Sequence, residues 1–135
     1  MQIPYIKSKG WIKKDIEKMF AGGSRSFSVF PLRVVYLPVE ELEADASILI
    51  SVSKRRFKRA VKRNRVKRQI REAYRVNKHE LLNVLAEKQC RLAIAFIYLS
   101  DQLVESAVIE ERVKTALARI AEKMAAQDAD AAVTL

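Results

Sequence analysis

Apolar residues recur along the first half of the chain with two periods, one helical and one typical of strands. Residues 11–20 place apolar side chains at helical spacing, which predicts a short amphipathic helix that Gly22-Gly23 ends. Residues 26–30 alternate weakly and, after Pro31, residues 32–37 are rich in β-branched and aromatic residues, so two strands are predicted. Residues 48–53 place Ile48, Ile50 and Val52 on one face and Leu49, Ser51 and Ser53 on the other, and predict a third strand.

The second half of the chain alternates between long helical patterns and one apolar run. Residues 60–76 carry an apolar stripe at positions 66, 70, 73 and 74, which predicts a helix. Residues 77–80 have the form of a capping box, so either a new short helix begins there or the first helix continues. Residues 91–99 are almost all apolar, as in a strand buried on both faces. Residues 106–124 predict a last amphipathic helix.

This order of elements, α-βββ-α-β-α, predicts an α+β fold: a single-domain α/β sandwich with a mixed four-stranded sheet. The strand–helix–strand run over residues 48–99 predicts two parallel strands joined by the central helix, with the right-handed crossover that is usual for such units. The 135 residues suffice for one domain, which we place at 11–124. Residues 1–10 are expected to be an irregular lead-in and residues 125–135 a flexible tail.

Composition restricts the chemistry available to the chain. The single Cys90 cannot form an intramolecular disulfide, and neither a CxxC pair nor a Cys/His cluster is present for zinc. His79 is the only histidine, so no metal-binding or general-base role is expected for it. Lysines interrupt the N-terminal segment, no apolar run is long enough for a membrane span, and we expect a protein of the reducing cytoplasm.

The positive charge is concentrated in one segment. Residues 54–75 hold twelve of the 26 Lys and Arg residues but only one of the 16 acidic residues, Glu72. The rest of the chain is therefore close to neutral, although the whole carries a net charge of +10. A local excess of this kind indicates a binding site for a polyanion rather than a general solubilising charge.

The charges in the central helix gather on one side of it. Five polar residues step by four, three, four and three and form what we call the basic row, which Lys67 flanks: Asn64, Arg68, Arg71, Arg75 and Lys78. A solvated helix face normally mixes acids with bases, and a membrane-surface helix would need a large apolar face, so nucleic acid is favoured. Charge alone leaves DNA and RNA open.

The same segment resembles a family signature. Residues 51–55 read S-V-S-K-R and residues 60–75 read A-V-K-R-N-R-V-K-R-Q-I-R-E-A-Y-R. They closely resemble the bacterial ribonuclease P protein, whose pattern is S-V-S-K-K followed by A-V-x-R-N-R-x-K-R-x-x-R-x-x-[FY]. Residues 14–20, K-D-I-E-K-M-F, support the match in the first helix. The family's glycine-containing loop is replaced here by residues 56–59, which contain no glycine.

The resemblance implies an accessory protein subunit of an endoribonuclease, a hydrolase whose catalytic centre belongs to an RNA subunit that uses Mg²⁺. The protein would bind that RNA and hold the 5′ leader of precursor tRNA in a cleft between the first helix and the sheet. The family's crossover is left-handed. The resemblance also implies two sets of site residues. The RNA-binding residues are Arg63, Asn64, Arg65, Lys67, Arg68, Arg71 and Arg75. The leader cleft is lined by Phe20, Tyr36, Ser51, Ser53, Lys54 and Arg55.

No catalytic or metal-ligating side chain, membrane or small-molecule substrate is implied, and a monomer within the ribonucleoprotein is expected. The rival hypothesis is a ribosomal or other structural RNA-binding protein without a leader cleft. A self-contained nuclease has no support, because the sequence offers no histidine pair, acidic metal cluster or nucleophile–base set.

Overall fold

The computed structural model describes residues 25–38 and 46–134. The predicted first helix, with Phe20, and the acidic residues 40–45 lie outside the described residues.

A mixed four-stranded sheet forms the centre of the fold. Its strands are β1 (Arg25–Val29), β2 (Leu32–Pro38), β3 (Ala46–Ser51) and β4 (Leu92–Tyr98), in the order β1-β2-β4-β3. β2 pairs with β1 and β4 in antiparallel fashion, whereas β3 pairs with β4 in parallel. The predicted mixed sheet, and the parallel pair within it, are confirmed.

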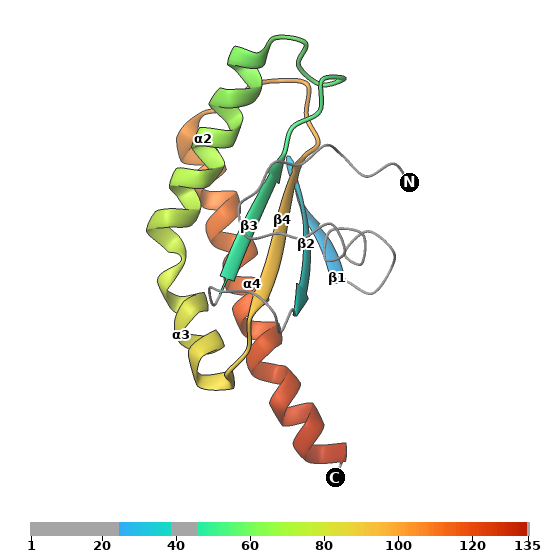
Figure 1. Cartoon of the computed structure of the whole chain (residues 1–135), viewed down its shortest axis with the longest axis vertical. Helices are drawn as coiled ribbons and strands as arrows, with labels where there is room; N and C mark the ends of the chain where they lie inside the picture. Colours follow the sequence, from blue (N-terminus) through green and yellow to red (C-terminus); the bar gives the residue numbers. More distant parts are fainter. Residues whose placement is uncertain (1–24, 39–45, 135) are drawn as a thin grey trace.

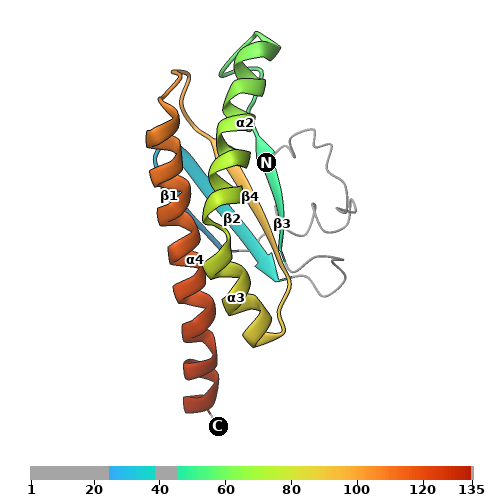
Figure 2. The ribbon, with the colours of Figure 1, turned by 90° about the vertical axis from the view of Figure 1, so that its left-hand side faces the viewer.

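Three helices lie together on one face of this sheet (Figures 1 and 2). They are α2 (Ala60–Asn77), α3 (His79–Lys88) and α4 (Ser106–Thr134). Lys78 separates α2 from α3, so a new short helix does begin after the basic helix. α4 continues through residues that we expected to form a tail. Alanine-rich sequence favours helix even where no apolar stripe remains to be read.

The crossover from β3 to β4 is left-handed, as the family resemblance implied and against the usual rule. In Figure 2 the helices stand in front of the sheet, β3 and β4 both run upward, and β4 lies to the left of β3. A right-handed connection between the same two strands would place α2 and α3 on the opposite face of the sheet. The left-handed path puts them on the face that α4 occupies, so that α2, α3 and α4 share one core.

The core follows from the alternation of side chains along the strands. Ile94 and Phe96 of β4 are fully buried on the helix-bearing face, where they meet Val66 and Ile70 of α2. Leu49 and its neighbours at every second position point to the other face of the sheet. β4 is buried on both faces, as its unbroken apolar sequence predicted. The sheet therefore gives α2 a rigid base along its apolar stripe.

Candidate nucleic-acid interface

The orientation of α2 is fixed from two sides. Its buried residues are Val66, Ile70, Ala73 and Tyr74, the stripe expected from the sequence. Gln69, on the flank toward α4, donates from Nε2 to the carbonyl oxygen of Val104 (3.1 Å) and to Oγ of Ser106 (3.0 Å). Burial raises the pKa of Tyr74, so its hydroxyl stays neutral in ordinary buffers. With these sides occupied, the remaining surface of α2 faces outward.

The basic row lies on that outward surface. Asn64, Arg68 and Arg71 are exposed, and so are Arg65 and most of the neighbouring cations, while Lys67 is half-buried on the flank. Among the described residues, no carboxylate forms an ion pair with any lysine or arginine from position 54 to position 71. An uncompensated row of guanidinium groups is costly for an isolated helix, because like charges one turn apart repel. The row is therefore suited to an external anion.

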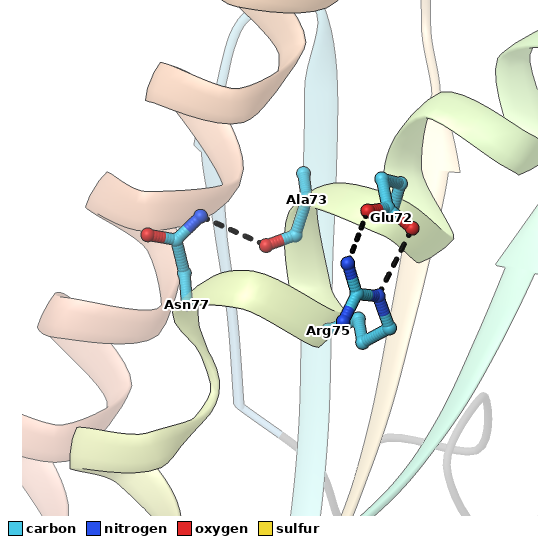
Figure 3. Close-up of polar contacts among 4 residues, drawn as sticks. All are labelled: Glu72, Ala73, Arg75 and Asn77. Atoms are coloured by element: carbon cyan, nitrogen blue, oxygen red, sulfur yellow. Dashed lines mark hydrogen bonds and ion pairs between the residues drawn. The ribbon is translucent and has the colours of Figure 1, made fainter.

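Arg75 differs from the other arginines of the row. It makes a two-bond contact with Glu72, with Nη2 2.5 Å from Oε1 and Nε 3.1 Å from Oε2 (Figure 3). This contact lowers the pKa of Glu72 and raises that of Arg75, chiefly through the hydrogen bonds between them. Both side chains are largely exposed, and exposed pairs of this kind contribute little to stability. Arg75 can bind an external phosphate only in competition with Glu72.

Asn77 does not cap α3. Its side-chain Nδ2 donates to the carbonyl oxygen of Ala73, one turn earlier in α2 (2.8 Å, Figure 3). Lys78 occupies the N-cap position of α3 without a side-chain hydrogen bond. The predicted capping box over residues 77–80 is therefore wrong, because the asparagine satisfies a carbonyl at the end of α2 instead of an amide at the start of α3.

The loop of residues 53–59, which we call the basic loop, joins β3 to α2 along a defined path. The backbone amides of Arg56 and Phe57 donate to the carbonyl oxygen of Ser53 at 3.1 and 3.3 Å, and Oγ of Ser53 accepts from Arg56 as well (3.3 Å). Phe57 is 5% exposed and packs on Tyr98, with ring centroids 5.9 Å apart. A buried aromatic anchor thus holds the loop that replaces the family's glycine-containing one, while the cations around it stay exposed.

Arg63 braces this loop. Its Nη1 donates to the carbonyl oxygens of Phe57 (2.7 Å) and Lys58 (2.8 Å). The side chain is half-buried, unlike that of Arg65 two residues later. Sequence reasoning placed Arg63 among the RNA-binding residues, and the structure gives it a second task, since one of its nitrogens is already engaged by the backbone.

A hollow of about 330 Å³ lies between α2 and α4 beside the basic row. Arg68 lines it together with residues of both helices, which include Gln69, Glu72, Ser106 and Glu110. Although two carboxylates line the hollow, neither forms an ion pair with Arg68 within the described part of the chain. The guanidinium of Arg68 therefore remains available at the rim.

The residues expected to line the leader cleft do not all share one surface. Ser51 is half-buried at the end of β3, on the sheet face opposite the helices, and Ser53, Lys54 and Arg55 are exposed just beyond it. Tyr36 lies on the other face. Its ring is 1% exposed, belongs to the core beneath the helices, and meets Phe27 edge-on. Tyr36 shares the face of Leu32 and Val34 in β2. Because the first helix, the other wall of the expected cleft, lies outside the described residues, the role of Tyr36 in the cleft stays a prediction.

Two residues that organise the site went unnoticed in the sequence, Phe57 and Gln69. The sequence did contain a signal for Phe57, because a large apolar residue within a run of cations is either exposed to water at a cost or buried in the core. Gln69 had none, since its partners Val104 and Ser106 lie 35 or more positions away in the sequence.

Taken together, the fold and the site define a class: a small α+β protein whose sheet presents a basic helix and a basic loop, surfaces suited to a polyanion. Comparison with known proteins identifies the family. The family model described as Ribonuclease P matches residues 12–123. The chain therefore belongs to the ribonuclease P protein family.

Individual relatives agree with this assignment. The ribonuclease P protein component of Porphyromonas gingivalis is 49% identical over 112 residues, 82% of this chain and 81% of the relative. That of Chlorobaculum tepidum is 34% identical over 93 residues, 64% of this chain and 60% of the relative. The fold also matches a solved structure of the Staphylococcus aureus RNase P protein, with a TM-score of 0.63 at 22% sequence identity. The match covers 90% of this chain and 96% of the Staphylococcus aureus chain. Membership implies participation in an endoribonuclease complex of tRNA processing with an RNA partner.

Proposed function

We propose that this chain binds the catalytic RNA of ribonuclease P through α2 and the basic loop, and assists removal of the 5′ leader from precursor tRNA. The observation that carries the proposal is the exposed basic row, which no carboxylate among the described residues neutralises between positions 54 and 71. The packing of α2 on the sheet fixes this row before any ligand arrives.

The row would work through charge and through preorganisation. A guanidinium fork can donate two parallel hydrogen bonds to a phosphate, and arginine is more weakly hydrated than lysine. Because α2 is already held by its buried stripe and by Gln69, little ordering of the backbone is needed on binding. Arg68 and Arg71 are the strongest contacts in this proposal, whereas Arg75 is weaker because it must first leave Glu72.

The leader would pass over the end of β3. Ser51, Ser53 and Lys54 follow one another from the sheet face opposite the helices into the basic loop. Hydroxyl groups and cations in this order suit the sugar–phosphate backbone of an unpaired strand, which carries charge at every nucleotide whatever its bases. The aromatic wall implied by the family resemblance, Phe20, lies outside the described residues.

The hydrolytic chemistry would belong to the RNA subunit, which would also hold the Mg²⁺ ions. Within residues 25–38 and 46–134 no group of three or more histidine, cysteine or acidic side chains is placed to hold a metal ion. The proposal also includes that the protein acts as a monomer within a cytoplasmic ribonucleoprotein. No helix in the described ranges is long and apolar enough to cross a membrane.

Reconstitution tests the proposal. The purified chain is mixed with the cognate RNA subunit at low Mg²⁺, and cleavage is followed on two precursor tRNAs, one with a long leader and one with a single leader nucleotide. We expect the protein to raise the cleavage rate, and to do so more for the long leader. No gain over RNA alone would refute the proposal, and an equal gain on both substrates would leave RNA binding but refute leader binding.

A further inference from the structure

Two further cations lie at the β1 edge of the sheet, the edge opposite to the one near α2. Arg119 and Lys123 of α4 both stand over the ring of Phe27 in β1, with Cζ of Arg119 and Nζ of Lys123 each 5.7 Å from the ring centroid. Phe27 is held from below by Tyr36, whose ring centroid is 6.2 Å away. We call Phe27, Arg119 and Lys123 the β1–α4 cluster.

The cluster keeps two positive charges together without neutralising them. Both cations are exposed and stand over one ring, so the two charges are within about 11 Å of each other, twice the distance of each from the centroid. Glu122 lines the same hollow of about 440 Å³, yet no ion pair joins it to either cation within the described part of the chain. The quadrupole of the ring orients the cations but supplies no full negative charge. An anion that reaches both cations would relieve their repulsion.

The position of the cluster separates it from the proposed RNA surface of α2. β1 and β3 form the two edges of the sheet, and α2 lies toward the β3 edge while the cluster lies at the β1 edge (Figure 2). Arg112 precedes Arg119 by two turns on α4, and its Nε donates to the carbonyl oxygen of Phe30 (3.0 Å). Phe30 itself is 68% exposed. Arg112 is itself paired with Glu111, so of these three cations Arg119 and Lys123 are left for a ligand along this edge, next to the exposed Phe30.

We infer that the β1–α4 cluster is a second RNA contact, which takes the phosphates of an unpaired strand on Arg119 and Lys123 and offers Phe30 for base stacking. This combination of cations along a backbone with an exposed ring is the one that sequence-independent single-strand binding uses. The inference rests on the proposed function, because it assumes that RNA is the partner. It adds a contact on the opposite edge, so that the protein bridges two segments of RNA.

Salt dependence of binding tests the inference. Arg119→Gln and Lys123→Gln each remove one charge, and Lys114→Gln removes the same charge from another exposed position of α4. Affinity for the cognate RNA subunit and for a precursor tRNA is measured from low to high salt. For the RNA that occupies the cluster, we expect each cluster variant to make the negative slope of log K against log salt less steep by about 0.7, the value for a single-strand phosphate contact. Lys114→Gln should leave the slope unchanged.

The outcomes separate this inference from the proposed function. Arg68→Gln and Arg71→Gln serve as the reference for α2. If these two change the slope while both cluster variants match Lys114→Gln on both RNAs, the second contact is refuted and the proposed function stands. If the α2 variants have no effect, the proposed function fails. A shift of oligomeric state in the cluster variants, seen by light scattering, would show that the cluster joins two copies of the chain and would also overturn the inference.

Discussion

Replacing Arg63 by alanine should loosen the basic loop while leaving the rest of α2 folded. The change removes the two hydrogen bonds from Nη1 to the carbonyl oxygens of Phe57 and Lys58. A hydrogen bond from a charged donor contributes about 1.5–3 kcal/mol. Because Arg63 is half-buried and Lys58 is exposed, we take that range for the two bonds together. Opening of the loop should therefore become about 10- to 150-fold more frequent.

Hydrogen exchange measures this opening directly. The amides of Arg56 and Phe57 donate to Ser53, so their protection reports whether the loop is closed. Arg65→Ala is the matched control, because it removes the same charge from the same helix and its side chain has no partner among the described residues. We expect faster exchange at positions 56 and 57 in Arg63→Ala and wild-type exchange in Arg65→Ala.

The same two variants distinguish two roles of Arg63, that of holding the basic loop in place and that of contacting RNA directly. If Arg63 acts through the loop, Arg63→Ala should also reduce the preference for a long leader, because Lys54 and Arg55 lose their fixed position. Arg63→Lys should rescue this only in part, since a lysine side chain places its nitrogen one bond closer to the backbone. Equal protection at positions 56 and 57 in Arg63→Ala and Arg65→Ala would refute the bracing role.

Three further predictions follow from the contacts in the site. Glu72→Gln should free Arg75 and tighten binding of the RNA subunit, by filter binding, whereas Glu72→Asp should not; unchanged affinity in Glu72→Gln would show that Arg75 takes no part. Phe57→Ala should lower the free energy of unfolding by about 3 kcal/mol in urea titrations, and a loss below about 1 kcal/mol would contradict its role as the anchor of the loop. Burial raises the pKa of Tyr74 above that of the unfolded chain, so the contribution of this residue to stability should be constant below about pH 10 and be lost above it. The free energy of unfolding should therefore fall less steeply above about pH 10 in Tyr74→Phe, and an identical pH profile for that variant would contradict the assignment.

The sheet and its helices could be predicted because period and burial agree in them. β3 carries apolar residues at every second position on one face, β4 is apolar throughout over a length typical of strands, and α2 has one apolar stripe at helical spacing. Each pattern favours the element that forms. The handedness of the crossover could not be predicted in this way. It depends on which face α4 also covers, and no local pattern contains that information. The family resemblance supplied it.

The site was predicted less completely than the fold. Charge and spacing placed the basic row on the surface, because a face so rich in arginine cannot be buried unpaired. They could not show that Arg75 reaches back to Glu72 or that Arg63 turns toward the loop, since rotamers decide both. The sheet face of Tyr36 could not be predicted either. Val35 and Leu37 are buried on the opposite face of β2, so alternation alone does not say which face the ring takes.

Crosslinking from α2 to the RNA subunit tests the central claim most directly. A photoreactive group is attached to Asn64→Cys in a Cys90→Ser background, with Lys114→Cys on α4 as the control position, because both side chains are exposed. We predict crosslinks to defined nucleotides of the RNA subunit from position 64 and none from position 114. Crosslinks from position 114 alone, or from neither position in an active complex, would contradict an RNA-binding role for α2.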